Sequence, residues 1–198
     1  MKVLFLLPLL FSLVSCAPAI NQKSAAIHAQ SAQNAIQNND WDVARVSWAK
    51  AVKNGELAGE SDQNMAILYY EYGRALGTTC YFQQSESYLK KAYDLDKKTG
   101  GPIYMSIVEL ARLNLDQKKY EIALPYFTEL MPILDKINAK EEAPIEYSNI
   151  LTEYSKVLAN TGNHEKSKSL LQEAASIRKN NQGGYSITER TLYGSQCK

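Results

Sequence analysis

The chain has 198 residues, which is enough for one domain with a sizeable hydrophobic core. Its 22 Lys and Arg nearly balance its 21 Asp and Glu, so it lacks the basic surface of a nucleic-acid-binding protein. Two His and three Cys leave few side chains from which a metal site could be built. Only 10 Gly and 6 Pro interrupt a sequence of mostly helix-forming residues, which favours an all-α fold.

The first sixteen residues have the pattern of an export signal. A twelve-residue apolar run, VLFLLPLLFSLV, occupies residues 3–14. A transmembrane helix needs about 20 apolar residues, whereas a shorter run is typical of a secretory signal peptide. The run ends in Leu13-Val14-Ser15-Cys16, which resembles the lipobox of bacterial lipoproteins. The alternative is an ordinary signal peptide that is cleaved near Ala17 or Ala19.

The lipobox resemblance implies that residues 1–15 are removed and that Cys16 becomes acylated. No cofactor is expected apart from these acyl chains, which would anchor the protein because each buried methylene contributes about 0.8 kcal/mol. In such lipoproteins an Asp after the cysteine favours the inner membrane, so Ala17 indicates the outer membrane. Residues 16–23 would form a lipidated polar tether, and the folded part would face the periplasm, an oxidising compartment.

Four segments share one pattern of small and large residues. They are WDVARVSWAKAV, FQQSESYLKKAY, YEIALPYFTELM and HEKSKSLLQEAA, which begin at residues 41, 82, 120 and 164. In each, a small residue follows the first position by three, a large residue follows by another four, and a further core residue by another three. This spacing places all of them on one face of a helix. The small residues are Ala44, Ser85, Ala123 and Ser167, and the large ones are Trp48, Leu89, Phe127 and Leu171.

This pattern resembles the second helix of a tetratricopeptide repeat. The family's first helix should then lie upstream with a small residue at its contact point, and Ala32, Gly73, Ala111 and Ser155 occupy that position. The resemblance covers residues 24–179 and implies a right-handed, all-α solenoid of about four helix pairs. The repeats are longer than the standard length of about 34 residues. Residues 180–198 would form a tail with a short capping helix near 187–192, where Ser186 and Glu189 resemble a capping box.

The resemblance also places a charged strip on the inner groove, which the first helix of each pair lines in this family. One groove position in each helix holds a glutamate, and the position three residues later holds a cation. The glutamates are Glu71, Glu109 and Glu153, and the cations are Arg74, Arg112 and Lys156. The position before each glutamate holds Tyr70, Val108 or Thr152. These charges could be simple pairs within each helix, worth a few tenths of a kcal/mol each. Alternatively, the cations act together and bind an acidic or C-terminal segment of a partner.

Two cysteines remain if Cys16 is acylated. Cys80 lies at the turn inside the second repeat, and Cys197 lies in the tail. Cys197 lies 18 positions after Lys179, and at about 3.3 Å per extended residue this length of chain can reach Cys80 if the tail follows the groove. The alternatives to a disulfide within the chain are two separate thiols or a bond to another chain.

No catalytic or phosphate-binding motif is present, and His28 and His164 occupy packing positions of separate repeats. We therefore expect a non-catalytic protein without a small-molecule substrate. The sequence predicts a membrane-anchored periplasmic scaffold or adaptor that binds a protein or peptide partner in cell-envelope assembly, as pilotins and adaptors of cell-wall enzymes do. The alternative is a permanent structural subunit of an envelope complex, and a hydrolase is a distant third.

Overall fold

The computed structural model describes residues 16–184 and 190–197, and within these ranges the regular structure is entirely helical. The predicted signal peptide, residues 1–15, therefore lies outside the described part. The helices are α1 (Cys16–Gln37), α2 (Trp41–Ala58), α3 (Asp62–Thr78), α4 (Phe82–Thr99), α5 (Ile103–Asp116), α6 (Tyr120–Lys136), α7 (Ala139–Glu142), α8 (Pro144–Asn160) and α9 (His164–Asn180).

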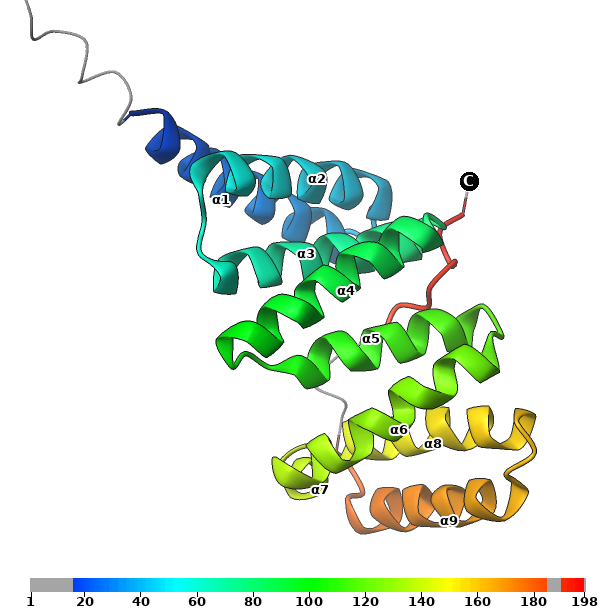
Figure 1. The fold of residues 1–198 in the computed structure, drawn as a ribbon. Helices are drawn as coiled ribbons and strands as arrows, with labels where there is room; N and C mark the ends of the chain where they lie inside the picture. The colour runs from blue at the N-terminus through cyan, green and yellow to red at the C-terminus, as the bar shows by residue number, and fades with distance from the viewer. Residues whose placement is uncertain (1–15, 185–189, 198) are drawn as a thin grey trace, which may run out of the picture.

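The helices form four pairs that stack in chain order, α1 with α2, α3 with α4, α5 with α6, and α8 with α9 (Figure 1). Each pair packs within itself and against the next pair, while the single turn of α7 joins α6 to α8. The all-α, helix-pair solenoid that the sequence predicts is confirmed. Among the helices that come first in the later pairs, α5 contacts both α3 and α8, and these three helices provide the frame for the candidate site.

The turn inside each pair uses one residue in the left-handed backbone region. These residues are Asn39, Cys80, Lys118 and Gly162, and each lies two residues before the second helix of its pair. Asn and Gly adopt this conformation at little cost, whereas Cys and Lys do so at a cost of about 1–2 kcal/mol. The four turns are therefore equivalent in geometry, although their sequences show little similarity.

The repeated small and large residues form the contact between the paired helices. The small residues of both helices in every pair are buried, and so are Trp48, Leu89 and Phe127. The fourth member of the large set, Leu171, is exposed, so its assignment to the core is wrong. Its helix, α9, belongs to the last pair in the described part of the chain, and within residues 16–184 and 190–197 no further pair covers that helix. The repeat pattern thus identifies the core in three pairs and fails at the end of the stack.

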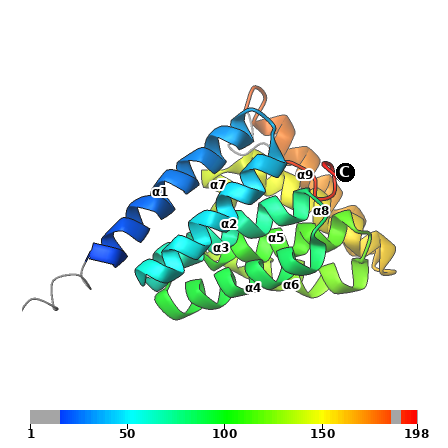
Figure 2. The same cartoon turned by 90° about the horizontal axis from the view of Figure 1, so that it is seen from above.

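The N-terminal helix begins earlier than the sequence suggests. Residues 16–23 lie inside α1 and do not form a separate tether. Pro18 is in the first turn, where a missing N–H costs little, and alanines on both sides of it favour helix. These turns lie at the edge of the molecule (Figure 2), and Ile20 is 63% exposed there. No helix among the described residues is long and apolar enough to cross a membrane.

The tail does not cap the last pair. Residues 190–192 are not helical, so the predicted capping helix is wrong there, and residues 185–189 of that prediction lie outside the described part. The tail segment, which we define as residues 190–197, returns past α5 to the end of α3 (Figure 1). Gly194 N–H donates to the Gly77 carbonyl at 3.0 Å, and Gln196 N–H donates to the Thr78 carbonyl at 3.1 Å. Specific contacts along α5 and α3 therefore replace the capping interaction.

Candidate functional site

A cavity of about 530 Å³ lies on the inner side of the stack, between α3, α5 and α8. We call it the concave cavity. Its wall is largely apolar, and charged side chains lie among the apolar ones. The apolar lining residues are Tyr70, Tyr104, Met105, Val108, Leu134, Ile137, Ala139, Ala143, Tyr147 and Ile150, and the charged ones are Glu71, Arg74, Glu109, Arg112, Glu142, Glu146 and Arg190.

The predicted strip is divided by the tail segment. The six predicted residues from α3 and α5 line the concave cavity: Tyr70, Glu71, Arg74, Val108, Glu109 and Arg112. The three from α8, Thr152, Glu153 and Lys156, line a second cavity of about 510 Å³. Arg190 borders both cavities, because the tail segment lies between them. The nine residues therefore do not form one continuous surface.

On α3, Arg74 and Glu71 form a pair within the helix. Arg74 Nη1 lies 3.2 Å from Glu71 Oε2, and both side chains are about one quarter exposed. The guanidinium also lies over the ring of Tyr70, 5.6 Å from its centroid. Burial raises the pKa of the Glu71 carboxyl, and the charge of Arg74 opposes that shift. This is the arrangement that spacing along one helix predicts.

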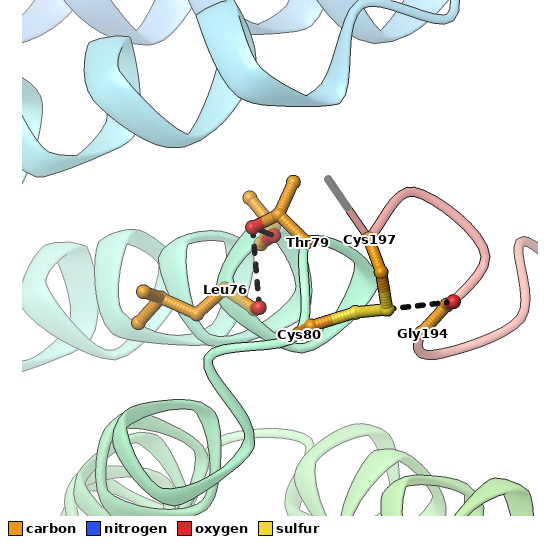
Figure 3. Close-up of a disulfide and its surroundings, with 6 residues drawn as sticks. Leu76, Thr79, Cys80, Gly194 and Cys197 are labelled. Carbon is orange, nitrogen blue, oxygen red and sulfur yellow. Dashed lines mark hydrogen bonds between the residues drawn. A yellow bond between two sulfur atoms is a disulfide. The ribbon is translucent and has the colours of Figure 1, made fainter.

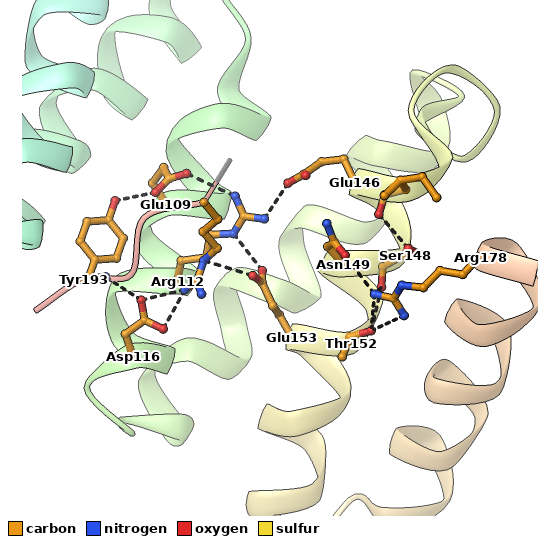
Figure 4. A network of polar contacts seen from close by, with 12 residues as sticks. Glu109, Arg112, Asp116, Glu146, Ser148, Asn149, Thr152, Glu153, Arg178 and Tyr193 are labelled. Carbon is orange, nitrogen blue, oxygen red and sulfur yellow. Dashed lines mark hydrogen bonds and ion pairs between the residues drawn. The ribbon is translucent and has the colours of Figure 1, made fainter. Parts of the chain in front are cut away.

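On α5, the equivalent Arg112 is the centre of a buried network (Figure 4). Its Nη2 lies 2.7 Å from Glu146 Oε1, its Nε lies 2.8 Å from Glu153 Oε2, and its Nη1 lies 3.4 Å from Glu109 Oε1. Arg112 is 5% exposed. Arg112 is therefore a buried residue, although the sequence analysis places it in an open strip on the inner groove. Its guanidinium joins α5 to α8, because Glu109 lies on α5 and both Glu146 and Glu153 lie on α8.

The third predicted pair is arranged differently. Glu153 lies against Arg112 and Arg190, whereas Lys156 is exposed and lines the second cavity. Burial raises the pKa of the Glu153 carboxyl, and the two arginines oppose this. A carboxylate that faces the interior between α5 and α8 is stabilised more by two guanidinium groups than by one flexible ammonium at the surface.

The tail segment contributes site residues that the sequence analysis missed. Arg190 Nη2 lies 2.7 Å from both carboxylate oxygens of Asp116, and Tyr193 N–H donates to Asp116 Oδ2 at 2.9 Å. The hydroxyl of Tyr193 donates to Glu109 Oε2 at 2.6 Å. Its ring fills the space beside Gly77, where an added Cβ would lie 2.3 Å from the ring. Cys197 was the feature of the sequence that indicated a tail lying along the groove. It did not indicate which residues Arg190 and Tyr193 would contact.

A disulfide joins Cys80 to Cys197 (Figure 3), with 5.4 Å between the two Cα atoms. Cys80 is at the turn after α3, and Cys197 is at the far end of the tail segment. The bond closes a loop across 117 positions of the chain. The tail segment is therefore held at both ends, by Arg190 at the α5–α8 junction and by the disulfide at α3.

The cavity carries no arrangement typical of metal binding. Among the described residues, no group of three or more His, Cys, Asp and Glu side chains could hold a metal ion. The carboxylates around Arg112 are instead directed at guanidinium groups. Neither His28 nor His164 lines the concave cavity. The described chemistry of the site is that of ion pairs, hydroxyl hydrogen bonds and apolar contact.

Comparison with known proteins gives the fold. Residues 148–181 match the tetratricopeptide repeat family model, which covers α8 and α9. The crystal structure of BtubC (BKLC) from P. vanneervenii superposes with a TM-score of 0.74 at 16% identity, over 85% of this chain and 68% of that one. A putative kinesin light chain from Podosopora anserina, with nearly identical TPR-like repeats, has a TM-score of 0.60 at 17% identity, over 86% and 90%.

A third crystal structure, aspartyl phosphate phosphatase F from Bacillus subtilis, has a TM-score of 0.51 at 17% identity, over 88% of this chain and 54% of that one. No curated protein sequence matches the chain significantly. At these identities the likeness concerns the fold. The chain therefore contains tetratricopeptide-like repeats and has the fold of helix-pair solenoids.

Proposed function

We propose that this chain is a lipid-anchored scaffold of the bacterial cell envelope that holds a protein or peptide partner on its concave side. The observation that carries the proposal is the concave cavity, which α3, α5, α8, the α6–α7 region and the tail segment line with both apolar and charged side chains. Binding sites for peptide side chains combine apolar walls with a few polar groups that fix orientation. Tetratricopeptide-like repeats supply such a surface because successive helix pairs keep one face open.

The sequence pattern at the N-terminus supports the location. Residues 13–16 match the lipobox of bacterial lipoproteins, and the intrachain disulfide is consistent with an oxidising compartment. We expect Cys16→Ala to abolish incorporation of radiolabelled palmitate and to leave the precursor uncleaved. Equal labelling of the variant and the wild type would contradict the anchor and leave the binding role to be tested separately.

The binding role is tested by photocrosslinking in intact cells. A benzophenone amino acid replaces Ile137, which lines the concave cavity and is 42% exposed. The matched control is the same replacement at Ile122 on α6, which is 48% exposed and lines neither of the cavities described above. We expect one defined crosslinked species from position 137 and none from position 122. Equal products from both positions, or none from either, would contradict binding at the concave face.

The alternative of a permanent structural subunit is favoured by one feature of α1. Ile20 and Ile27 are both more than half exposed, and a separation of seven residues places them on one face of the helix. Such a face could pack permanently against a neighbouring subunit. A structural subunit would remain in a complex of constant composition after high-salt washing, whereas a scaffold with an open cavity would exchange its partner.

A further inference from the structure

The charged groups around the concave cavity are unequal in number. Three guanidinium groups, those of Arg74, Arg112 and Arg190, face five carboxylates in two sets of contacts, the Arg74–Glu71 pair and the network around Arg112 and Arg190. The carboxylates are Glu71, Glu109, Asp116, Glu146 and Glu153. These groups together have a formal charge of −2 when all are ionised, although Asp116 and Glu153 line the second cavity. The charged residues that line the concave cavity itself, Glu142 included, are four glutamates and three arginines, which leaves an excess of one negative charge.

Two of the three arginines, Arg112 and Arg190, have little capacity left for an anionic ligand, whereas Arg74 is about one quarter exposed and contacts Glu71 through Nη1. Arg112 is 5% exposed and uses Nη1, Nη2 and Nε on three carboxylates. Arg190 is engaged by Asp116 and Glu153. A ligand carboxylate would have to displace one of these contacts or share Arg74 with Glu71, and in either case it would increase the excess of negative charge. The acidic or C-terminal peptide segment suggested by the sequence is therefore a poor fit to the cavity.

The tail segment shows which chemistry this groove accepts from a peptide. It places a guanidinium, Arg190, against two carboxylates and an aromatic ring with its hydroxyl, Tyr193, against a third. Tyr193 is 7% exposed, so its ring is as buried as a core residue. The chain itself thus already holds a basic side chain, and an aromatic one three positions later, against carboxylates of α5 and α8 beside the concave cavity.

We infer that the concave cavity binds a basic segment of a partner, in which a Lys or Arg side chain meets the excess carboxylates and a neighbouring large apolar side chain meets the apolar wall. Glu71 and Glu142 are the carboxylates of the lining that lie outside the Arg112 network. Met105 and Ile137 provide apolar surface in the same cavity. This inference rests on the proposed function and names the chemistry of its ligand.

Capped dipeptides test the inference with the full mature chain. The probes are acetyl-Leu-Lys-amide, acetyl-Leu-Gln-amide and acetyl-Leu-Glu-amide, which differ only in the charge of one side chain. Binding is measured by titration with nuclear magnetic resonance detection of backbone amides. We expect the Lys probe to bind at least about tenfold more tightly than the Gln probe, and the Glu probe to bind most weakly. Shifts should centre on residues 70–74 and 104–109.

Variants locate the charge that matters. Glu71→Gln combined with Glu142→Gln should remove most of the preference for Lys over Gln, because both carboxylates become neutral at nearly the same size. Glu121→Gln is the matched control, since Glu121 is exposed on α6 and lines neither cavity. Ile137→Ser should weaken the Lys and Gln probes by a similar factor. Equal binding of the three probes, tighter binding of the Glu probe, or no binding at millimolar concentration would overturn the inference.

The test of the basic ligand and the test of the proposed function can fail independently of each other. Crosslinking at position 137 in cells together with no preference for the Lys probe would retain the scaffold and reject the basic ligand. A clear preference for the Lys probe without any crosslinked partner would retain the site chemistry and reject the envelope scaffold.

Discussion

Two equivalent regions of the molecule, α3 and α5, carry the same Glu-x-x-Arg pattern and use it differently. On α3, Glu71 and Arg74 are partly exposed and pair with each other. On α5, Arg112 is almost fully buried and contacts three carboxylates, two of which belong to α8. The spacing within each helix is identical, so the difference comes from what each helix packs against.

The neighbour of α5 explains the difference. Glu146 and Glu153 lie on α8, 34 and 41 positions further along the chain than Arg112, and the tail segment adds Tyr193 to Glu109. An exposed ion pair contributes about 0–1 kcal/mol to the free energy of unfolding. Removing one partner of a buried ion pair lowers that free energy by about 3–5 kcal/mol, because the other charge is left buried and unpaired. The same pattern can therefore be a partly exposed pair within one helix in one repeat and a buried contact between two helices in the next.

The largest expected effect follows from removing the buried cation. Arg112→Gln leaves Glu109, Glu146 and Glu153 without their common partner, and we expect a loss of about 3–5 kcal/mol in the free energy of unfolding. Arg74→Gln, the matched change on α3, should cost less than about 1 kcal/mol. Urea unfolding followed by circular dichroism measures both. Similar losses for the two variants would mean that the two regions are energetically equivalent.

The next effect concerns the disulfide that holds the tail segment beside α5. Cys197→Ser should lower the free energy of unfolding by about 2–5 kcal/mol, because the bond closes a loop across 117 positions. Wild-type protein with reductant should match the variant, and a wild type that is insensitive to reductant would contradict the prediction.

The backbone of residue 80 adds a second prediction, since its φ of 73° lies in the left-handed region that glycine adopts easily. Cys80→Gly should lower the free energy of unfolding by about 1 kcal/mol less than Cys80→Ser does.

A smaller effect tests the fit of Tyr193 against α3. An added Cβ at Gly77 would lie 2.3 Å from the Tyr193 ring and 2.7 Å from Ser85 Oγ, so Gly77→Ala should cost about 1–3 kcal/mol. In the double variant with Tyr193→Ala, the combined loss should be smaller than the sum of the two single losses, because the clash with the ring is gone. Combination with Ile122→Ala should be additive. An additive result with Tyr193→Ala would mean that the ring does not dock at this position.

The sequence predicted the frame of the site better than its contacts. Periodicity identified the second helix of each pair, and the resemblance to tetratricopeptide repeats identified the small residue of the first helix, such as Ala111, because both depend on residues that are close along the chain. It did not identify the partners of Arg112 or the docking of Arg190, because these contacts join positions 34 to 74 residues apart. Helical spacing also predicted a Glu153–Lys156 pair, whereas the arginines of other segments compete successfully for Glu153.

The smallest effect concerns Glu71, the carboxylate on α3 that faces Arg74 and Glu109. Burial raises the pKa of its carboxyl above the ordinary value of 4.5, with Arg74 opposing the shift. The folded state therefore binds the proton of Glu71 more tightly than the unfolded state does. The stabilisation by protonated Glu71 is complete below about pH 4.5 and is lost as the pH rises through the folded pKa.

Glu71→Gln cannot titrate, so the wild type should lose stability relative to this variant between pH 4.5 and pH 7. Urea unfolding across this range measures the difference, with Glu121→Gln as the exposed control, and a constant or opposite difference would show that burial does not govern the titration of Glu71.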